Sequence, residues 1–299
     1  MRDLELLHHY TTSTYVTLTR GRKEHEKVWQ ETVPQLALEH EFLMHGILAL
    51  SALHLAHKRL VDSKQYSTIA ANHEGFALPL FRSNASRITR ENCTAVFAFS
   101  ALVVIYAMAS LEPSEDRLFV DFGIAGKLPK WIQLLHGIYT LLSPAWQWIA
   151  EGPMASIMKR LKVKTVSSQP NEVGFNALLL SFASLGSSSS RSEAELCTAL
   201  EYVRGSFWVP FLSDGTFGVE SMPCISQIRG PSTFAKLLGE RRPQALIILA
   251  HHSVLLRLVG PSWFMDNLVQ RVVSYIHENL DEEWKGWISW PLQQIQLGD

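Results

Sequence analysis

The chain has 299 residues, of which 47% are apolar and 18% charged, and its formal net charge is −1. Such a length allows a large buried core, and the near-zero charge argues against a nucleic-acid-binding surface, which would carry a basic stripe. The low charged fraction indicates unusually complete burial, an apolar internal cavity, or a surface that contacts a partner.

The N-terminal segment shows no secretory signal. Met1 to Tyr10 contains Asp3 and Glu5 and has no apolar stretch that ends in small residues, so we do not expect a signal peptide. The basic residues between positions 20 and 27 alternate with glutamates, which is typical of a solvated helix face and not of a nucleic-acid-binding patch.

Residues 35–60 form a long helix pattern without proline, with apolar residues on nearly every side of a helix of about 3.6 residues per turn. Protein must therefore cover several of its sides. The histidines in this segment do not predict a metal site. His40 and His45 are five residues apart and face different sides of the helix. His54 and His57 have no nearby carboxylate at helical spacing.

Residues 95–109, AVFAFSALVVIYAMA, form the longest apolar run. Its 15 residues are too few to cross a bilayer, which takes about 20. We expect a buried helix with Thr89 as its N-cap and Glu91 in its first turn, ending before Pro113.

The middle of the chain has the weakest helix pattern. VKTVSSQP, near residues 163–170, and GSSSSRS, near residues 186–192, predict mobile loops. Neither is long enough to separate two domains, so we expect residues 1–299 to form one domain. No repeat of fixed period is visible, which makes a tetratricopeptide-like array the weaker alternative.

The whole pattern predicts an all-α fold, because no convincing run of alternating strand residues occurs. We expect a single irregular domain of about 12–15 helices with room for an internal apolar pocket. The predicted helices are residues 2–18, 22–30, 35–60, 64–84, 90–110, 115–123, 127–141, 144–160, 171–184, 192–205, 207–212, 232–238, 242–259, 262–278 and 280–288.

Seven segments in a fixed order resemble a known protein family. They are LHHYTTSTY at 7–15, WQETVP at 29–34, the helix at 35–59, RITRENCTAVFAFSAL at 87–102, WIQLLHGI at 131–138, RPQALIILAHHSVLL at 242–256 and LDEEWKGWISWP at 280–291. Together they are similar to the C-terminal regulatory domain of fungal zinc-cluster transcription factors, in the branch that includes sterol uptake control proteins. The resemblance covers nearly all of the chain and implies a sterol or a related lipid as ligand.

The zinc cluster of that family is absent from these residues. It needs six closely spaced cysteines around two zinc ions, and the sequence has only Cys93, Cys197 and Cys224. They lie far apart, with no C-x-x-C pair, so neither a zinc site nor a disulfide framework is predicted, and an odd count fits a reducing intracellular compartment. We expect them to be small buried apolar residues.

A lipid pocket would need an apolar wall and a few polar groups. His251 and His252 interrupt an apolar helix, so at least one points inward, either as a hydrogen-bonded interior histidine or as the anchor of a ligand hydroxyl. His136 has the same two interpretations, and most of the nine tryptophans are expected to be packing anchors. The candidate ligand-binding residues are Phe97, Phe99, Tyr106, Met108, Trp131, His136, His251, His252 and Trp263.

The sequence predicts no catalytic residue, metal ligand or cofactor. No G-x-S-x-G turn or glycine-rich phosphate loop occurs. The acidic triplet at 281–283 fits the first turn of a helix better than the magnesium site of an all-α terpene cyclase.

These observations favour a ligand-sensing regulatory domain that acts in the nucleus, or in the cytoplasm when it is ligand-bound or not attached to a DNA-binding module. We expect no direct nucleic-acid contact and no membrane span. One alternative is a stand-alone protein of secondary metabolism that uses the same pocket to bind, cyclise or isomerise a hydrophobic metabolite. Another is a co-regulator that forms homodimers or heterodimers with full-length relatives.

Overall fold

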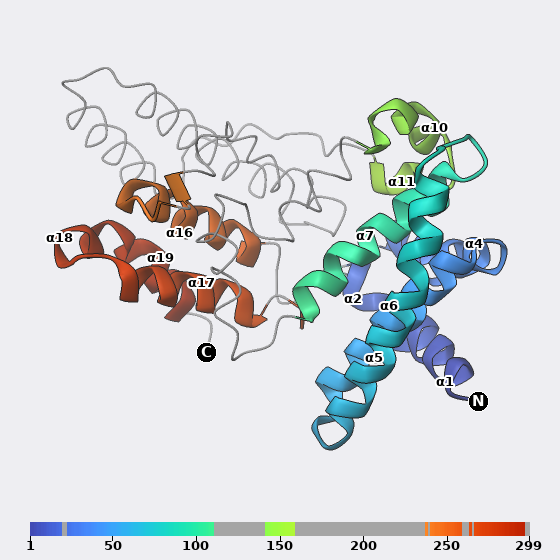
Figure 1. Ribbon diagram of the computed structural model, residues 1–299, viewed down its shortest axis with the longest axis horizontal. Coiled ribbons are helices and arrows are strands. Elements are labelled where there is room, and N and C mark those ends of the chain that lie inside the picture. Colours follow the sequence, from blue (N-terminus) through green and yellow to red (C-terminus); the bar gives the residue numbers. More distant parts are fainter. Residues whose placement is uncertain are drawn as a thin grey trace.

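The computed structural model describes residues 1–19, 23–110, 141–158, 237–238, 240–258, 263–264 and 266–296 (Figure 1). These residues contain helices and no β-strand, which confirms the predicted all-α class. None of the described helices is long and apolar enough to cross a membrane. Several predictions lie wholly or mostly outside the described residues, namely the helices at 115–123, 127–141, 171–184, 192–205, 207–212 and 232–238 and the loops near 163–170 and 186–192.

The helix predicted over residues 2–18 contains a wider turn. Its parts are α1 (Arg2–His9), the π-helical turn η1 (Tyr10–Thr14) and α2 (Val16–Thr19). In η1 the N–H of Tyr15 donates to the carbonyl of Tyr10, five residues earlier. The hydroxyl groups of Thr11 and Thr12 donate to the carbonyl of His8. Such side-chain bonds compete with the regular helix bonds.

A second π-helical turn lies in the next helical segment. This segment consists of α3 (Lys23–Lys27), the π-helical turn η2 (Val28–Thr32) and α4 (Val33–Glu39). Pro34 lies in the first turn of α4, a position that proline tolerates well. The helix predicted at 22–30 therefore continues past Pro34 to residue 39.

The prediction of one continuous helix over 35–60 is wrong at His40. This residue has an extended backbone, with φ −127° and ψ 95°, and separates α4 from α5 (Glu41–Lys58). Its carbonyl accepts the N–H groups of Leu43 (2.9 Å) and Met44 (3.2 Å), so His40 occupies the N-cap position of α5. No glycine or proline marks this break, which instead fits the packing of α4 and α5 against each other.

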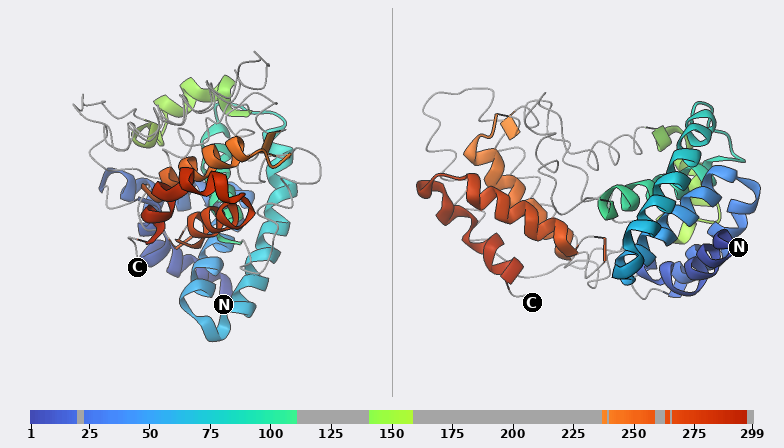
Figure 2. Two further views of the ribbon diagram at one scale, coloured as in Figure 1. Left: turned by 90° about the vertical axis from the view of Figure 1, so that its left-hand side faces the viewer. Right: turned by 60° about the horizontal axis from the view of Figure 1, so that its bottom comes forward.

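Three long helices form the centre of the N-terminal half (Figures 1 and 2). They are α5, α6 (Ser63–Ala85) and α7 (Cys93–Ala109), with the 3-10 turn η3 (Leu60–Asp62) between the first two. The middle of α5 is buried on all sides, as its apolar pattern predicts. Gly46 lies where α5 meets α7, because a Cβ atom there would be 2.7 Å from Cδ2 of Phe99.

The prediction that Thr89 caps α7 and that Glu91 lies in its first turn is wrong, because the helix begins at Cys93 with Asn92 at the N-cap position. Thr89 and Glu91 lie before the helix, at and within the turn that leads into it. The N–H of Thr89 donates to Oδ1 of Asn92 (2.8 Å), and the N–H of Asn92 donates to Oγ1 of Thr89 (3.4 Å). This reciprocal pair is the hydrogen-bond arrangement of a capping box.

The helix predicted at 144–160 is broken at Gly152, which is extended with ψ −170°. The result is a short 3-10 turn, η4 (Ser143–Ala145), followed by α10 (Trp146–Glu151) and α11 (Ala155–Met158). Pro153 directly after Gly152 prevents an easy continuation, since the residue before a proline disfavours helical backbone angles.

The C-terminal helices lie together, on the left of Figure 1. They are α16 (Pro243–Leu258), α17 (Asp266–Asn279), α18 (Glu282–Lys285), the 3-10 turn η6 (Gly286–Ile288) and α19 (Ser289–Gln296). The helix predicted to end at 288 therefore continues in α19 through Pro291, which lies in the first turn of that helix and is tolerated there.

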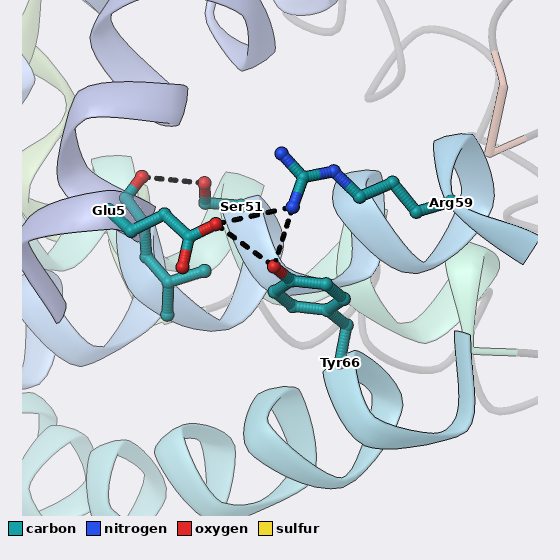
Figure 3. A network of polar contacts seen from close by, with 5 residues as sticks. Glu5, Ser51, Arg59 and Tyr66 are labelled. Atoms are coloured by element: carbon teal, nitrogen blue, oxygen red, sulfur yellow. Dashed lines mark hydrogen bonds and ion pairs between the residues drawn. The ribbon is translucent and has the colours of Figure 1, made fainter. Parts of the chain in front are cut away.

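A polar network holds α1 against the α5–α6 hairpin (Figure 3). The hydroxyl of Tyr66 donates to Oε1 of Glu5 (2.9 Å) and accepts from Nη1 of Arg59 (2.9 Å). On the adjacent turn, the buried hydroxyl of Ser51 donates to the carbonyl of Leu6 (2.6 Å). These bonds fix the position of the N-terminal helix, and hence of the π-helical turn that follows it.

Candidate functional site

Part of the predicted ligand-binding set lies outside the described structure. Trp131 and His136 belong to residues that are not described, and so does the side chain of His252, although its backbone is part of α16. The remaining predicted residues come from α7, from α16 and from the segment before α17.

Phe97 and Phe99 lie on different sides of α7. The ring of Phe97 packs edge-on against Trp146 of α10, with 6.3 Å between ring centroids. Phe99 instead packs against Phe42 and Phe81, at 5.5 Å and 4.7 Å between centroids. Because residues two apart on a helix point in different directions, these two rings do not form one wall.

Tyr106 and Met108 belong to different clusters of the core. Tyr106 packs in a cluster from α1, α5 and α6, with Trp263 against it. Its hydroxyl is bonded to Glu74, and burial raises the pKa of the phenol. Met108 lies in the larger core cluster, which includes the C-terminal helices.

His251 is an interior histidine with a hydrogen bond. Its Nδ1–H donates to the carbonyl of Ile247 (2.9 Å), and its ring stacks on Trp290 of α19 with 5.7 Å between centroids. Burial lowers the pKa of His251 to about 4, so the ring is neutral at neutral pH. This geometry agrees with the first of the two interpretations of His251.

Trp263 connects segments that are far apart in the sequence. Its Nε1–H donates to the hydroxyl of Thr17 on α2 (3.1 Å). Its ring stacks on His54 of α5, with 5.0 Å between centroids and 20° between the planes, and also contacts His57 at 5.7 Å. The ring of His9 also lies near His54, with 5.0 Å between the two ring centroids.

The two π-helical turns lie beside this stack and contact each other. Nε2 of Gln30 in η2 donates to the carbonyl of Thr11 in η1 (3.0 Å). The hydroxyl of Thr14 in η1 lies 3.0 Å from Nδ1 of His54, within hydrogen-bond distance. We call η1, η2 and the side chains of His54 and Trp263 the π-turn junction. π-Helical turns are rare and are frequently found at functional sites.

Several polar atoms in and next to the π-turn junction are buried without a hydrogen-bond partner among the described residues. They are Oη of Tyr10, Nε1 of Trp29 and Nε2 of His9. Tyr10 is 0% exposed and Trp29 is 1% exposed. Buried polar groups are normally bonded to protein or to ordered water, so each exception needs an explanation.

His54 is held in the neutral form. Burial, with His9 and Lys58 nearby, lowers the pKa of His54 to about 3. Burial and the charge of Lys58 also lower the pKa of His9 below its ordinary value. The π-turn junction thus presents uncharged polar groups inside an apolar helical core, which suits an uncharged ligand better than an ion.

A second histidine pair lies on the other side of α5, and it is not among the residues predicted from the sequence. Nδ1 of His45 and Nδ1 of His73 are 2.9 Å apart, which links α5 to α6. Nε2 of His45 lies 3.9 Å from Glu41, and Nε2 of His73 lies 3.7 Å from Asp3. The pKa of His73 is lowered chiefly by burial, although Asp3 opposes this shift.

The described residues contain no group of three or more His, Cys, Asp or Glu side chains that could hold a metal ion. His54 contacts Thr14 and Trp263, and Glu282 pairs with Lys285 in α18. Cys93 is buried and its thiol donates to the carbonyl of Arg90 (3.4 Å).

Comparison with protein families agrees with the motifs of the sequence. Residues 5–202 match the family model described as "Fungal specific transcription factor domain". The chain is 26% identical over 329 aligned positions to a "Zn(2)-C6 fungal-type transcription factor" of Gibberella zeae, and the match covers 98% of this chain and 61% of that relative.

Two further relatives are both called "Sterol uptake control protein 2". The protein of Saccharomyces cerevisiae is 29% identical over 145 residues, which are 48% of this chain and 15% of the relative. The protein of Candida albicans is 32% identical over 148 residues, which are 49% of this chain and 19% of the relative. The chain thus spans only part of the length of each of these three relatives.

Proposed function

We propose, from the premise that this chain belongs to the fungal specific transcription factor domain family, that it is the regulatory part of a transcription regulator controlled by a sterol or a related lipid. Its relatives are transcription regulators, and two of them carry sterol uptake in their names. Residues 1–299 would act together as one regulatory domain, in the nucleus.

The observation that carries the proposal is the π-turn junction. Uncharged polar atoms that have no hydrogen-bond partner among the described residues are buried there between apolar helices, as a site for a mostly apolar molecule requires. The junction also joins η1, α5 and Trp263, whose positions in the sequence are far apart. A ligand that contacts this place would touch several helices at once.

The ligand would act by binding one arrangement of these helices more tightly than another. A ligand shifts a conformational equilibrium only by its difference in affinity for the two states. The bond between Trp263 and Thr17 connects the N-terminal helices to the C-terminal part and would be made or broken in such a shift. The change would then be transmitted to a surface that contacts a partner protein.

We assign Tyr106 and Trp263 to the apolar wall next to the junction, since both pack in the cluster formed by α1, α5 and α6. The other predicted ligand-binding residues stay predictions, namely Phe97, Phe99, Met108, Trp131, His136, His251 and His252. The stand-alone protein of secondary metabolism and the dimerising co-regulator also stay predictions, because no described contact favours either.

The experiment adds ergosterol to the purified full chain and measures the thermal midpoint and the rate of cleavage by a protease. At a free concentration of one hundred times Kd, a ligand that binds only the folded state stabilises it by about 2.7 kcal/mol. We expect a higher midpoint and slower cleavage with ergosterol, and no change with hexadecanol, which has a hydroxyl but no rigid rings. Unchanged midpoint and cleavage at saturating ergosterol would contradict the proposal.

A further inference from the structure

Two histidines on neighbouring helices meet through the same ring nitrogen. Nδ1 of His45 on α5 and Nδ1 of His73 on α6 are 2.9 Å apart, and the ring centroids are 5.2 Å apart. At this distance one nitrogen has to carry a proton and the other a lone pair, because two lone pairs or two N–H groups would repel each other. The contact therefore depends on the number of protons that the two rings hold.

The second ring nitrogen of each histidine faces a carboxylate. Nε2 of His45 lies 3.9 Å from Oε1 of Glu41, one turn earlier on α5, and Nε2 of His73 lies 3.7 Å from Oδ1 of Asp3 on α1. These distances exceed that of an ordinary hydrogen bond, so the carboxylates act through their negative charge. The four groups join α1, α6 and α5, and we call them the histidine row: Asp3, His73, His45 and Glu41.

The two rings are much less exposed than the two carboxylates. The side chains of His73 and His45 are 11% and 22% exposed, whereas those of Asp3 and Glu41 are 69% and 75% exposed. Phe76 of α6 stacks on the ring of His45, with 5.5 Å between centroids. Helix α7, which packs against both α5 and α6, contains no Asp, Glu, Lys, Arg or His. A positive charge on the rings is thus stabilised mainly by the two carboxylates.

Counting protons shows which state fits this geometry. With two protons, both rings are neutral, and the ring that donates through Nδ1 turns an unprotonated Nε2 toward its carboxylate. With three protons, the Nδ1 contact keeps its one proton and each Nε2–H faces a carboxylate. With four protons, both Nδ1 atoms carry a proton, and two positive rings face each other at 2.9 Å. The arrangement accommodates one added proton and excludes a second.

We propose that the histidine row is an acid-sensitive contact that joins α1, α5 and α6 while the two rings share at most one positive charge, and that separates when both rings are positive. In the acid state, repulsion replaces the bond between the Nδ1 atoms. The exposed carboxylates offset this repulsion only in part, because water and salt screen them. The two protonation steps belong to the pair of rings and not to one residue.

The direction of the pKa of His73 agrees with this proposal. Burial lowers this pKa, and the charge of His45 lowers it further, although Asp3 of α1 opposes the shift. The folded chain therefore resists a proton that the unfolded chain accepts near pH 6.5. The stability that neutral His73 contributes is present above this pH and is lost as the pH falls below it.

The first test is a double-mutant cycle of His45→Leu and His73→Leu in the full chain, measured by urea unfolding at pH 7.5 and pH 5. Leucine is bulky and forms no side-chain hydrogen bond, and the cycle cancels the separate effect of each substitution. At pH 7.5 we expect a favourable coupling of about tenfold in the unfolding equilibrium constant, the effect of about one net hydrogen bond. At pH 5 the coupling should be absent or unfavourable. The control cycle combines His73→Leu with His8→Leu, which removes an exposed histidine, and should be additive at both pH values.

The second test measures hydrogen exchange of the wild-type chain and needs no substitution, so it applies even if a variant does not fold. We expect the protection factors of the α6 amides around His73 to fall between pH 7.5 and pH 5. An equal coupling at both pH values, or no coupling at pH 7.5, would overturn the proposal. Unchanged protection factors would also overturn it, because the rings would then stay together when both are positive.

Discussion

The close contact between α5 and α7 at Gly46 predicts that Gly46→Ala carries a steric cost in the free energy of unfolding. The added Cβ would lie 2.7 Å and 2.8 Å from Cδ2 and Cε2 of Phe99, far inside the ordinary carbon–carbon separation of about 3.5–4.0 Å. Phe99 is only 1% exposed and is enclosed by Phe42 and Phe81, so its ring cannot turn away. Overpacking of this kind costs about 1–3 kcal/mol.

Gly75→Ala on α6 is the matched control. A Cβ at Gly75 would meet no atom within 4 Å, so this substitution gains only the helix propensity of alanine, about 1 kcal/mol. Gly46→Ala has the same gain from propensity, because both glycines lie inside helices. The difference in the free energy of unfolding between the two variants therefore isolates the steric cost, and we expect it to be about 1–3 kcal/mol.

Urea unfolding followed by far-UV circular dichroism measures this difference. We expect Gly75→Ala to unfold at a higher urea concentration than wild type and Gly46→Ala at a lower concentration than Gly75→Ala, with equal slopes. If Gly46→Ala were as stable as Gly75→Ala, α5 and α7 would not approach each other as closely as described, and the reasoning on the core would be refuted.

Two further predictions concern the π-turn junction. The lowered pKa of His54, about 3, means that below pH 6.5 the unfolded chain binds a proton that the folded chain does not, so stability should fall as pH drops from about 6.5 towards 3. His54 contributes at most about 1.4 kcal/mol per pH unit to this loss. Urea titrations at several pH values should show that the free energy of unfolding of His54→Gln depends less steeply on pH than that of wild type. An equally steep dependence would contradict the burial of His54. Trp263→Phe keeps an aromatic ring but loses the bond to Thr17, and should lower the free energy of unfolding by about 0.5–1.5 kcal/mol. In a double-mutant cycle with Thr17→Val, additive effects would show that the two side chains do not interact.

The all-α class could be predicted because the pattern of apolar residues indicates a helix even when the segments that pack against it are unknown. The run at 95–109 is apolar on all sides, and a helix of that kind has to be buried. The break at His40 could not be predicted, since neither a glycine nor a proline occurs near it. Its extended backbone fits the packing of α4 against α5, which is a tertiary contact.

Only part of the π-turn junction could be predicted from the sequence. Trp263 was predicted as a site residue from its type, but its contacts with His54 and Thr17 depend on which helices become neighbours. Tyr10 and Trp29 were missed, because a sequence does not show whether a buried hydroxyl or indole N–H has a partner. Both residues lie in segments, LHHYTTSTY and WQETVP, that resemble the transcription factor family. This resemblance is the one signal in the sequence that points to them.

The pairing of His45 with His73 illustrates the same limit. The two residues are 28 positions apart on different helices, and their Nδ1 atoms meet only because α5 and α6 pack in one particular register. Helix periodicity predicts which side of a helix a residue occupies, but it does not predict which residue of the next helix lies opposite.

The proposed function requires that this chain carries a lipid in its helical interior. The most direct test is mass spectrometry of an organic extract of the purified full chain, compared with an unrelated protein prepared in the same way. We expect a neutral, sterol-sized alcohol at close to one molecule per chain. An extract without any enriched lipid, from protein that also fails to bind ergosterol, would contradict the claim.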